Sequence, residues 1–131
     1  MATVRQFAAL CGATYEIERC LTFYPEKAQS IWDANVGYSN ALKTAGGQAK
    51  RRAGIISIEL NPKLPQISGE PKSTFLHEVA HCLQYIIYGK GDHGFTFWEI
   101  MFRLGQKPTR CHSYDFRSID EPDLNIDDLG L

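Results

Sequence analysis

Residues 73–94 read STFLHEVAHCLQYIIYGKGDHG and contain the pattern that decides the fold. Apolar residues recur in this stretch every three or four positions, a spacing that gives a helix one buried face. They are Leu76, Val79, Ala80, Leu83, Ile86 and Ile87. Ser73 and Thr74 are both suitable N-caps, and Gly89 is a typical stop. The stretch therefore predicts a helix from Ser73 or Thr74 to about Tyr88.

The string His77-Glu78-Val79-Ala80-His81 lies inside this predicted helix. A helix advances 3.6 residues per turn, so histidines four positions apart project from one face and can share one metal ion. This spacing suits tetrahedral zinc, and Glu78 would point to the side where a zinc-bound water sits. The alternative is two satisfied polar histidines on a half-exposed helix. It is disfavoured because the string arises by chance in fewer than about one in a hundred chains of this length.

A catalytic zinc site needs a third protein ligand and leaves its fourth position to water. His93 is the first candidate, because it lies in a glycine-flanked turn that can fold the chain back over the metal. Glu99 in the following helix is the competing candidate, since another class of zinc peptidase takes a glutamate from there. A longer motif would place a glycine and a further histidine three and six residues after His81. Gln84 and Ile87 occupy those positions, so that motif is missing.

The remaining elements predict one small zincin-like α+β domain. Helical periodicity in residues 15–24 and 25–32 predicts N-terminal helices. Three short runs have strand character and predict a short three-stranded antiparallel or mixed sheet. They are residues 36–38, 45–49 and 54–60. After the His93 turn, the apolar spacing of residues 97–104 predicts a second C-terminal helix that ends at Gly105. Parallel βαβ alternation is missing, which favours the α+β class.

Length and composition place the chain among ordinary globular domains. It has 131 residues, 44% of them hydrophobic, and a net charge of -1, which predicts one domain with its own core. The first twenty residues lack the apolar core of a secretory signal, and no apolar run approaches the roughly 20 residues that cross a bilayer. We therefore expect a cytoplasmic monomer with no membrane partner.

The four cysteines are scattered and form no CxxC pair. This excludes a cysteine-built zinc ribbon and favours free thiols in a reducing compartment. The cysteines are Cys11, Cys20, Cys82 and Cys111. Cys82 adjoins His81, but consecutive helix residues point about 100° apart, so it should not share the metal.

Charge is unevenly distributed along the chain. Between residues 43 and 63, five basic residues accompany a single acid, Glu59. Four of the basic residues could form a DNA-binding patch near the predicted zinc site. Such a patch would associate the protein with the nucleoid. They are Lys43, Lys50, Arg51 and Arg52. From charge alone, a solvated strand and loop face is the better explanation. Residues 115–131 carry six acids and one base without helical periodicity, which predicts a flexible acidic tail after a domain of residues 1–114.

Five stretches, in this order, resemble the SprT-like metallopeptidase family, which includes bacterial SprT proteins and Spartan-type DNA-protein crosslink proteases. They are Thr44-Ala45-Gly46, Ile58-Glu59-Leu60-Asn61-Pro62, His77-Glu78-Val79-Ala80-His81, His93-Gly94-Phe95-Thr96-Phe97 and Arg110-Cys111-His112-Ser113-Tyr114. Position by position, the resemblance implies one zinc ion at His77, His81 and His93, with Glu78 as general base. Many members of the family add a cysteine-rich zinc ribbon, whereas this chain has only an acidic segment after Tyr114.

The residues and the resemblance together predict a zinc-dependent endopeptidase. A zinc-bound water would attack the peptide bond, and Glu78 would accept its proton and deliver it to the leaving amine. His112 or Tyr114 could donate a hydrogen bond to the tetrahedral oxygen, although surface packing explains both residues equally well. The peptide would pair with an exposed sheet edge, expected at residues 54–60, which favours broad sequence tolerance.

Three functional hypotheses remain open. The first is a peptidase that acts on DNA-associated or crosslinked proteins. The second is a peptidase with a free protein substrate. The third is a non-catalytic, zinc-stabilised adaptor that binds DNA or protein.

Overall fold

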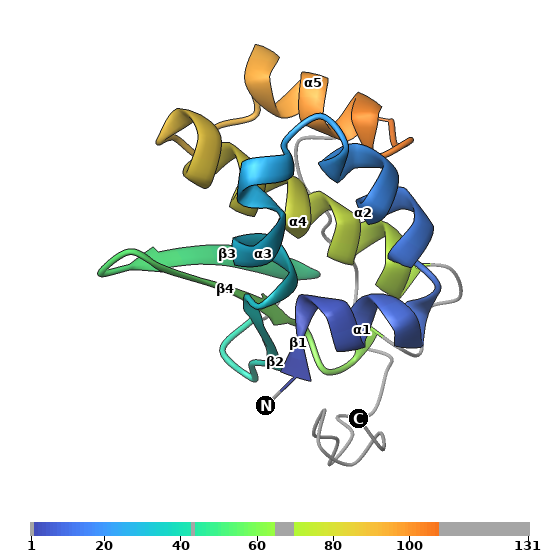
Figure 1. Ribbon diagram of the computed structural model, residues 1–131. Helices are drawn as coiled ribbons and strands as arrows, with labels where there is room; N and C mark the ends of the chain where they lie inside the picture. The colour runs from blue at the N-terminus through green and yellow to red at the C-terminus, as the bar shows by residue number, and fades with distance from the viewer. Residues whose placement is uncertain (1, 43, 65–69, 108–131) are drawn as a thin grey trace.

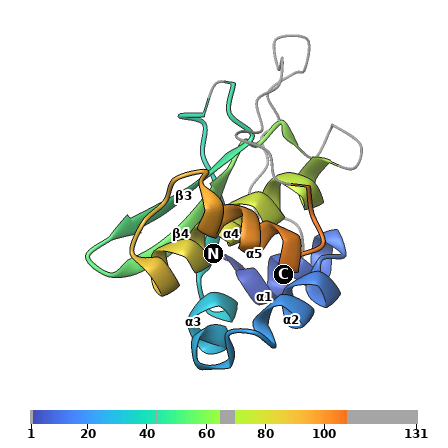
Figure 2. The same ribbon diagram turned by 90° about the horizontal axis from the view of Figure 1, so that it is seen from above.

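The computed structural model describes residues 2–42, 44–64 and 70–107. In chain order the elements are β1 (Ala2–Thr3), α1 (Val4–Cys11), α2 (Thr14–Leu21), the short 3-10 helix η1 (Pro25–Lys27), α3 (Ala28–Trp32), β2 (Asn35–Tyr38), β3 (Gly47–Arg52), β4 (Ile55–Leu60), α4 (Glu70–Tyr88) and α5 (Phe95–Arg103). Within these ranges, five α-helices and a four-stranded mixed sheet confirm the predicted α+β class. The longest helix, α4, runs through the middle of the molecule, with α1, α2 and α3 on one side of it (Figures 1 and 2).

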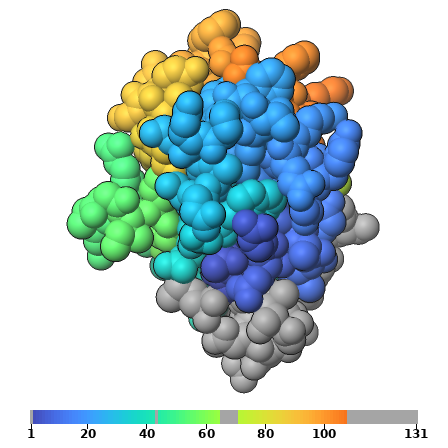
Figure 3. Space-filling model, viewed as in Figure 1, coloured from blue at the N-terminus to red at the C-terminus, as the bar shows by residue number. Residues whose placement is uncertain are grey.

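The sheet has the strand order β1-β2-β4-β3. The hairpin β3–β4 is antiparallel, β2 pairs with β4 in parallel, and β1 pairs with β2 antiparallel. The three predicted strands correspond to β2, β3 and β4, although β3 begins and ends later than predicted. The fourth strand, β1, has only two residues, too few for an alternating pattern to indicate it. The tip of the hairpin projects from the body of the molecule (Figure 3).

The prediction that residues 54–60 form the exposed sheet edge is wrong. β4 lies inside the sheet, because β2 pairs with one of its sides and β3 with the other. β3 ends the sheet within the described residues. The parallel pairing joins segments about twenty residues apart, so no local pattern in the sequence reports it. The two edge strands are therefore the very short β1 and the six-residue β3, and β3 packs against α4.

The helix α4 begins at Glu70, so the prediction of an N-cap at Ser73 or Thr74 is wrong. Thr74 is buried within the helix. Pro71 indicates the earlier start, because proline is tolerated in the first turn, where its missing N–H would have no helical partner. The predicted stop is confirmed, since the helix ends at Tyr88 and Gly89 adopts a left-handed φ of 71°.

The core lies between α4, the surrounding helices and one face of the sheet. The predicted apolar face of α4 is largely buried, and the inner stripe of α5 is buried completely. The α5 stripe consists of Phe97, Ile100, Met101 and Leu104. Phe75 of α4 packs against Phe7 of α1, with ring centroids 4.8 Å apart. None of the helices in the described ranges is long and apolar enough to cross a membrane.

The cysteines within the described ranges are free thiols, as the sequence predicts. They are Cys11, Cys20 and Cys82. Burial raises the pKa of Cys11 to about 11 and that of Cys20 to about 12, so both thiols are protonated at neutral pH. Cys82 is completely buried among apolar side chains. These thiols therefore behave as small apolar groups.

Replacing Phe75 with alanine tests the proposed core. We expect Phe75→Ala to lower the free energy of unfolding by about 3–5 kcal/mol, because a fully buried ring is lost and a cavity remains. The matched control is Phe102→Ala in α5, where the ring is 80% exposed, and it should change stability by less than about 0.5 kcal/mol. Urea unfolding followed by circular dichroism measures both values. Equal losses in the two variants would contradict this packing.

Candidate metal centre

Three histidine side chains meet beside the middle of α4. His77 and His81 project from one face of that helix, and His93 comes from the turn between α4 and α5. One ring nitrogen from each residue lies within 4.8 Å of the other two. The Nε2 atoms of His81 and His93 are 3.1 Å apart. Tetrahedral zinc, bound at about 2.0–2.1 Å, separates its ligand nitrogens by about 3.3 Å, so this donor set fits a metal ion.

The turn after α4 brings His93 back over the helix. Gly89 ends α4 with its left-handed backbone, and Gly91 then packs directly against the Tyr85 ring. A side chain at position 91 would collide with that ring, so the close approach requires glycine. The glycine-flanked turn therefore does what the sequence predicts and places His93 beside the two histidines of α4.

Glu99, the competing third ligand, does not belong to the histidine cluster. Its Oε1 atom accepts hydrogen bonds from the hydroxyls of Tyr24 and Tyr88, each at 3.4 Å. The same oxygen lies 3.4 Å from Arg103, one turn further along α5. Glu99 therefore joins α5 to neighbouring elements, and His93 is the residue that completes the group of three.

Phe97 packs against all three imidazoles. Its ring centroid lies 5.0 Å from that of His77, 4.4 Å from that of His81 and 5.1 Å from that of His93. The residue is fully buried in the first turn of α5. The sequence indicates Phe97 as part of an apolar stripe and of a stretch that resembles the family, but not that its ring packs against all three imidazoles. The ring limits the orientations that the three imidazoles can adopt.

Burial controls the charge of His81. Together with a smaller contribution from the nearby His93, and against an opposing hydrogen bond from Gln84, it lowers the pKa of His81 to about 4. His81 is therefore neutral at pH 7, and a neutral imidazole is the form that binds a metal ion.

Glu78 lies in the same cavity as the three histidines. Its side chain is buried, and this burial raises its pKa to about 8. A hydrogen bond from the backbone N–H of Ala49 in β3 partly opposes the shift. A cation held by the histidines would also favour the carboxylate. The site thus combines three imidazoles with one buried carboxyl group in the same cavity.

The cavity around these residues has a volume of about 220 Å³. Strand β3 forms one wall, α4 supplies the floor, and the turn that carries His93 forms another wall. Figure 2 shows this turn passing over β3.

Asn61 holds the segment that leads into β3, because its side-chain amide donates hydrogen bonds to the carbonyls of Leu42 and Ala45 at 3.2 and 3.3 Å. Both carbonyls precede β3, whose first residue, Gly47, lies against the side chain of Glu78.

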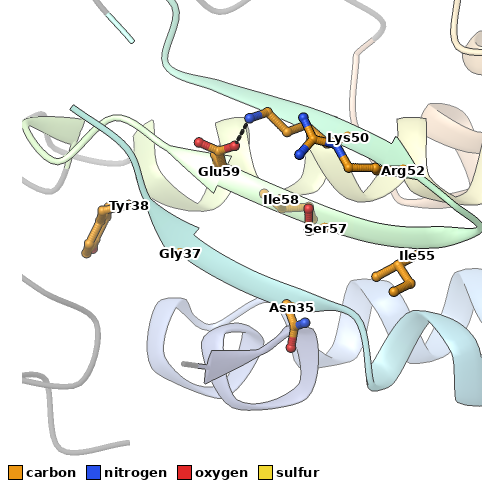
Figure 4. Close-up of a pocket in the computed structure, with 9 residues that line it drawn as sticks. All are labelled: Asn35, Gly37, Tyr38, Lys50, Arg52, Ile55, Ser57, Ile58 and Glu59. Carbon is orange, nitrogen blue, oxygen red and sulfur yellow. Dashed lines mark ion pairs between the residues drawn. The ribbon is translucent and has the colours of Figure 1, made fainter. Parts of the chain in front are cut away.

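The described basic residues do not form one patch. Neighbouring residues of β3 point to opposite faces of the sheet. Arg51 faces α4, with its guanidinium over the Tyr85 ring, 5.3 Å from the centroid. Lys50 and Arg52 line a second cavity of about 460 Å³ on the other face, where Lys50 forms an ion pair with Glu59 (Figure 4).

Several predictions concern parts of the chain outside the described residues. Lys43, His112 and Tyr114 all lie there. The proposed domain boundary at residue 114 and the acidic segment 115–131 lie there as well. These predictions therefore remain as the sequence states them.

The fold and the site define an α+β protein with a candidate metal centre made of three histidines, with a glutamate beside it. The model of the SprT-like family matches residues 17–116. This is most of the chain, and the chain belongs to the SprT-like family, whose members are in general metalloprotease-like. No curated protein matches the chain. No solved structure matches it.

Comparing His93→Ala with Glu99→Ala tests which residue completes the metal centre. We expect His93→Ala to weaken Zn²⁺ binding by about 100-fold or more, because it removes a ligand nitrogen and not merely a supporting group. Glu99→Ala should leave Zn²⁺ affinity unchanged, since its carboxylate contacts tyrosines and an arginine. Competition with a chelating dye measures both affinities. The opposite order of effects would show that the ligand set is wrong.

Proposed function

We propose that this protein is a zinc-dependent endopeptidase. One observation carries the proposal: a buried carboxyl group, Glu78, shares a cavity with three imidazoles whose ring nitrogens converge. Metal-assisted hydrolysis needs this combination of a three-ligand metal site and an adjacent base. Membership of a metalloprotease-like family supports the same conclusion.

His77, His81 and His93 would hold the metal ion. Three neutral nitrogen donors without a thiolate suit zinc in a site that keeps one position open. When bound, zinc would act as a Lewis acid on the scissile carbonyl and lower the pKa of a coordinated water towards roughly 7. A zincin-like arrangement would follow, in which the His77-Glu78-Val79-Ala80-His81 segment of α4 and the turn after it supply the ligands and the base.

Glu78 would transfer the proton that peptide hydrolysis requires. Its carboxylate accepts a proton from the attacking water and delivers it to the amine that leaves. The hydrogen bond from the backbone N–H of Ala49 orients the carboxylate, while burial keeps its proton affinity high. His112 and Tyr114, outside the described residues, remain candidates to donate a hydrogen bond to the tetrahedral oxygen.

The peptide substrate would pair in extended form with β3. In the hairpin, the backbone N–H of Asn61 donates to the carbonyl of Gly46 at 2.8 Å. Because such pairs alternate along an antiparallel ladder, the backbone groups of Ala49 and Arg51 point away from β4. The hydrogen bond from Ala49 to Glu78 agrees with this direction. A peptide paired here would lie across the catalytic carboxylate, and main-chain pairing favours broad sequence tolerance.

We propose DNA-associated or crosslinked proteins as the substrate class. The sequence supports this through its excess of basic residues between positions 43 and 63, and the family resemblance supports it as well. Lys50 and Arg52 share a concave face of the sheet opposite the metal centre, where phosphate groups could bind (Figure 4). A free protein substrate and a non-catalytic adaptor are the alternatives, and the two experiments below separate them.

Glu78→Gln tests the catalytic role directly. This change keeps the size of the side chain and removes the base, so we expect peptide cleavage to fall by about 10²–10⁴-fold. Zinc content should remain stoichiometric, because no ligand nitrogen is lost. Cleavage of unfolded casein and elemental analysis give the two readouts, with Glu99→Gln as the control that keeps activity. A Glu78→Gln protein that cleaves casein at the parental rate would contradict the mechanism. If Glu78→Gln abolishes cleavage but leaves the protein's biological effect in cells unchanged, the adaptor hypothesis would be favoured.

Single alanine substitutions at neighbouring positions of β3 test DNA binding. We expect Lys50→Ala and Arg52→Ala to weaken DNA binding and each to reduce the slope of log affinity against log salt concentration by about one. Arg51→Ala is the matched control, because this side chain faces α4 and should leave DNA affinity unchanged. Fluorescence anisotropy with a labelled oligonucleotide at several salt concentrations measures the effect. Equal loss in all three variants would place the DNA elsewhere, and no binding by the parent protein would favour a free protein substrate.

A further inference from the structure

Gln84 is a fully buried polar residue one turn after His81 on α4. Its side-chain amide takes part in three hydrogen bonds. The Oε1 atom lies 3.3 Å from Nδ1 of His81, and the Nε2 atom lies 2.8 Å from Oδ1 of Asp92 and 2.9 Å from Oγ1 of Thr96. The amide therefore connects a candidate ligand on α4 with the neighbour of another candidate ligand and with the first turn of α5.

The chemistry of Asp92 fixes the orientation of this amide. Asp92 is exposed to solvent and is ionised at neutral pH, so its carboxylate can only accept hydrogen bonds. The backbone N–H of Gly94 donates to the same Oδ1 atom at 3.0 Å. The NH₂ group of Gln84 must therefore face Asp92, and the amide oxygen must face His81. The second N–H of Gln84 is directed at Thr96.

The orientation of Gln84 in turn fixes the tautomer of His81. An amide oxygen only accepts, so Nδ1 of His81 must carry the proton. A neutral imidazole has one proton, which leaves the lone pair on Nε2. This is the nitrogen that lies 3.1 Å from Nε2 of His93. The lone pair of His81 therefore points into the histidine cluster, as metal binding requires.

The same amide also restrains the turn that carries His93. Asp92 directly precedes His93, and its hydrogen bonds to Gln84 and Gly94 hold this part of the turn in place. Gln84 is buried, whereas Asp92 is exposed, so the bond ties an exposed position of the turn to the buried side of α4. One side chain thus controls the ring of one candidate ligand and the position of another.

We propose that Gln84 is a positioning residue of the metal centre, which sets the tautomer of His81 and holds the His93 turn at coordination distance. The inference rests on the proposed zinc site and adds to it a residue that contacts neither zinc nor substrate. Supporting hydrogen bonds of this kind typically contribute 10- to 100-fold to metal affinity. Gln84 and Asp92 act as one unit in this arrangement, because each fixes the other.

The first experiment replaces Gln84 with methionine, which has a similar length and forms no comparable hydrogen bond. We expect Gln84→Met to weaken Zn²⁺ binding by about 10- to 100-fold in a chelator competition. In the metal-free protein, imidazole ¹⁵N NMR should show that His81 loses its preference for the Nδ1–H tautomer. Gln29→Met is the control, because Gln29 lies on α3 and its side-chain amide donates a hydrogen bond to Asp33 and not to a candidate ligand. A folded Gln84→Met protein with parental affinity and the parental tautomer would overturn the inference.

The second experiment leaves Gln84 in place and removes its partner. Asp92 is exposed, so Asp92→Ala should fold normally even if Gln84→Met does not. We expect Asp92→Ala to weaken Zn²⁺ binding about tenfold, although Asp92 is not a ligand. The double variant should bind about as weakly as Gln84→Met alone, because residues in one network are not additive. Parental affinity in Asp92→Ala would overturn the inference.

The two readouts separate this inference from the proposed function. If the parent protein binds no zinc, the proposed function fails, and the tautomer of His81 in the metal-free protein still decides the role of Gln84. If the parent binds zinc, and Gln84→Met and Asp92→Ala bind it as tightly as the parent does, the inference alone fails. A tautomer that changes in Gln84→Met is a result that a merely structural role would not produce.

Discussion

Three imidazoles and one carboxyl group are held together in an apolar part of the molecule. This is costly for His81 and Glu78, because burial disfavours their charged forms, lowers the pKa of His81 and raises the pKa of Glu78. A divalent cation would offset the cost, since it uses the lone pairs of the imidazoles and favours a neighbouring carboxylate. Much of the fold, including Gly91 and Phe97, serves to hold this cluster in place.

Side chains alternate along β3, so the two faces of this strand border two different cavities. On the α4 face, β3 supplies the wall of the metal cavity and the backbone hydrogen bond to Glu78. On the opposite face, Lys50 and Arg52 border a second, larger cavity. Because the strand is also the edge of the sheet, a third direction remains for an extended peptide. One six-residue strand therefore offers a different side to each of the proposed base, substrate and DNA.

The sequence predicts the features that depend on local periodicity. The apolar face of α4, the stripe on α5, and the grouping of His77 with His81 follow from helical spacing, and the glycine-flanked turn indicates His93. Pairing between distant segments is not encoded in this way, so β1 and the central position of β4 were missed. The role of Gln84 was missed for a similar reason, because its partner Asp92 comes close only after the turn has folded.

X-ray absorption spectroscopy at the zinc edge of the purified protein tests the central claim most directly. It reports the number and distances of the nearest atoms, distinguishes sulfur from nitrogen or oxygen, and recognises imidazole by its outer ring atoms, without a substrate or an assay. The account predicts one zinc ion per chain with three imidazole nitrogens and one oxygen at about 2.0–2.1 Å. Sulfur in the first coordination shell, a six-oxygen environment, or protein without stoichiometric zinc would contradict it.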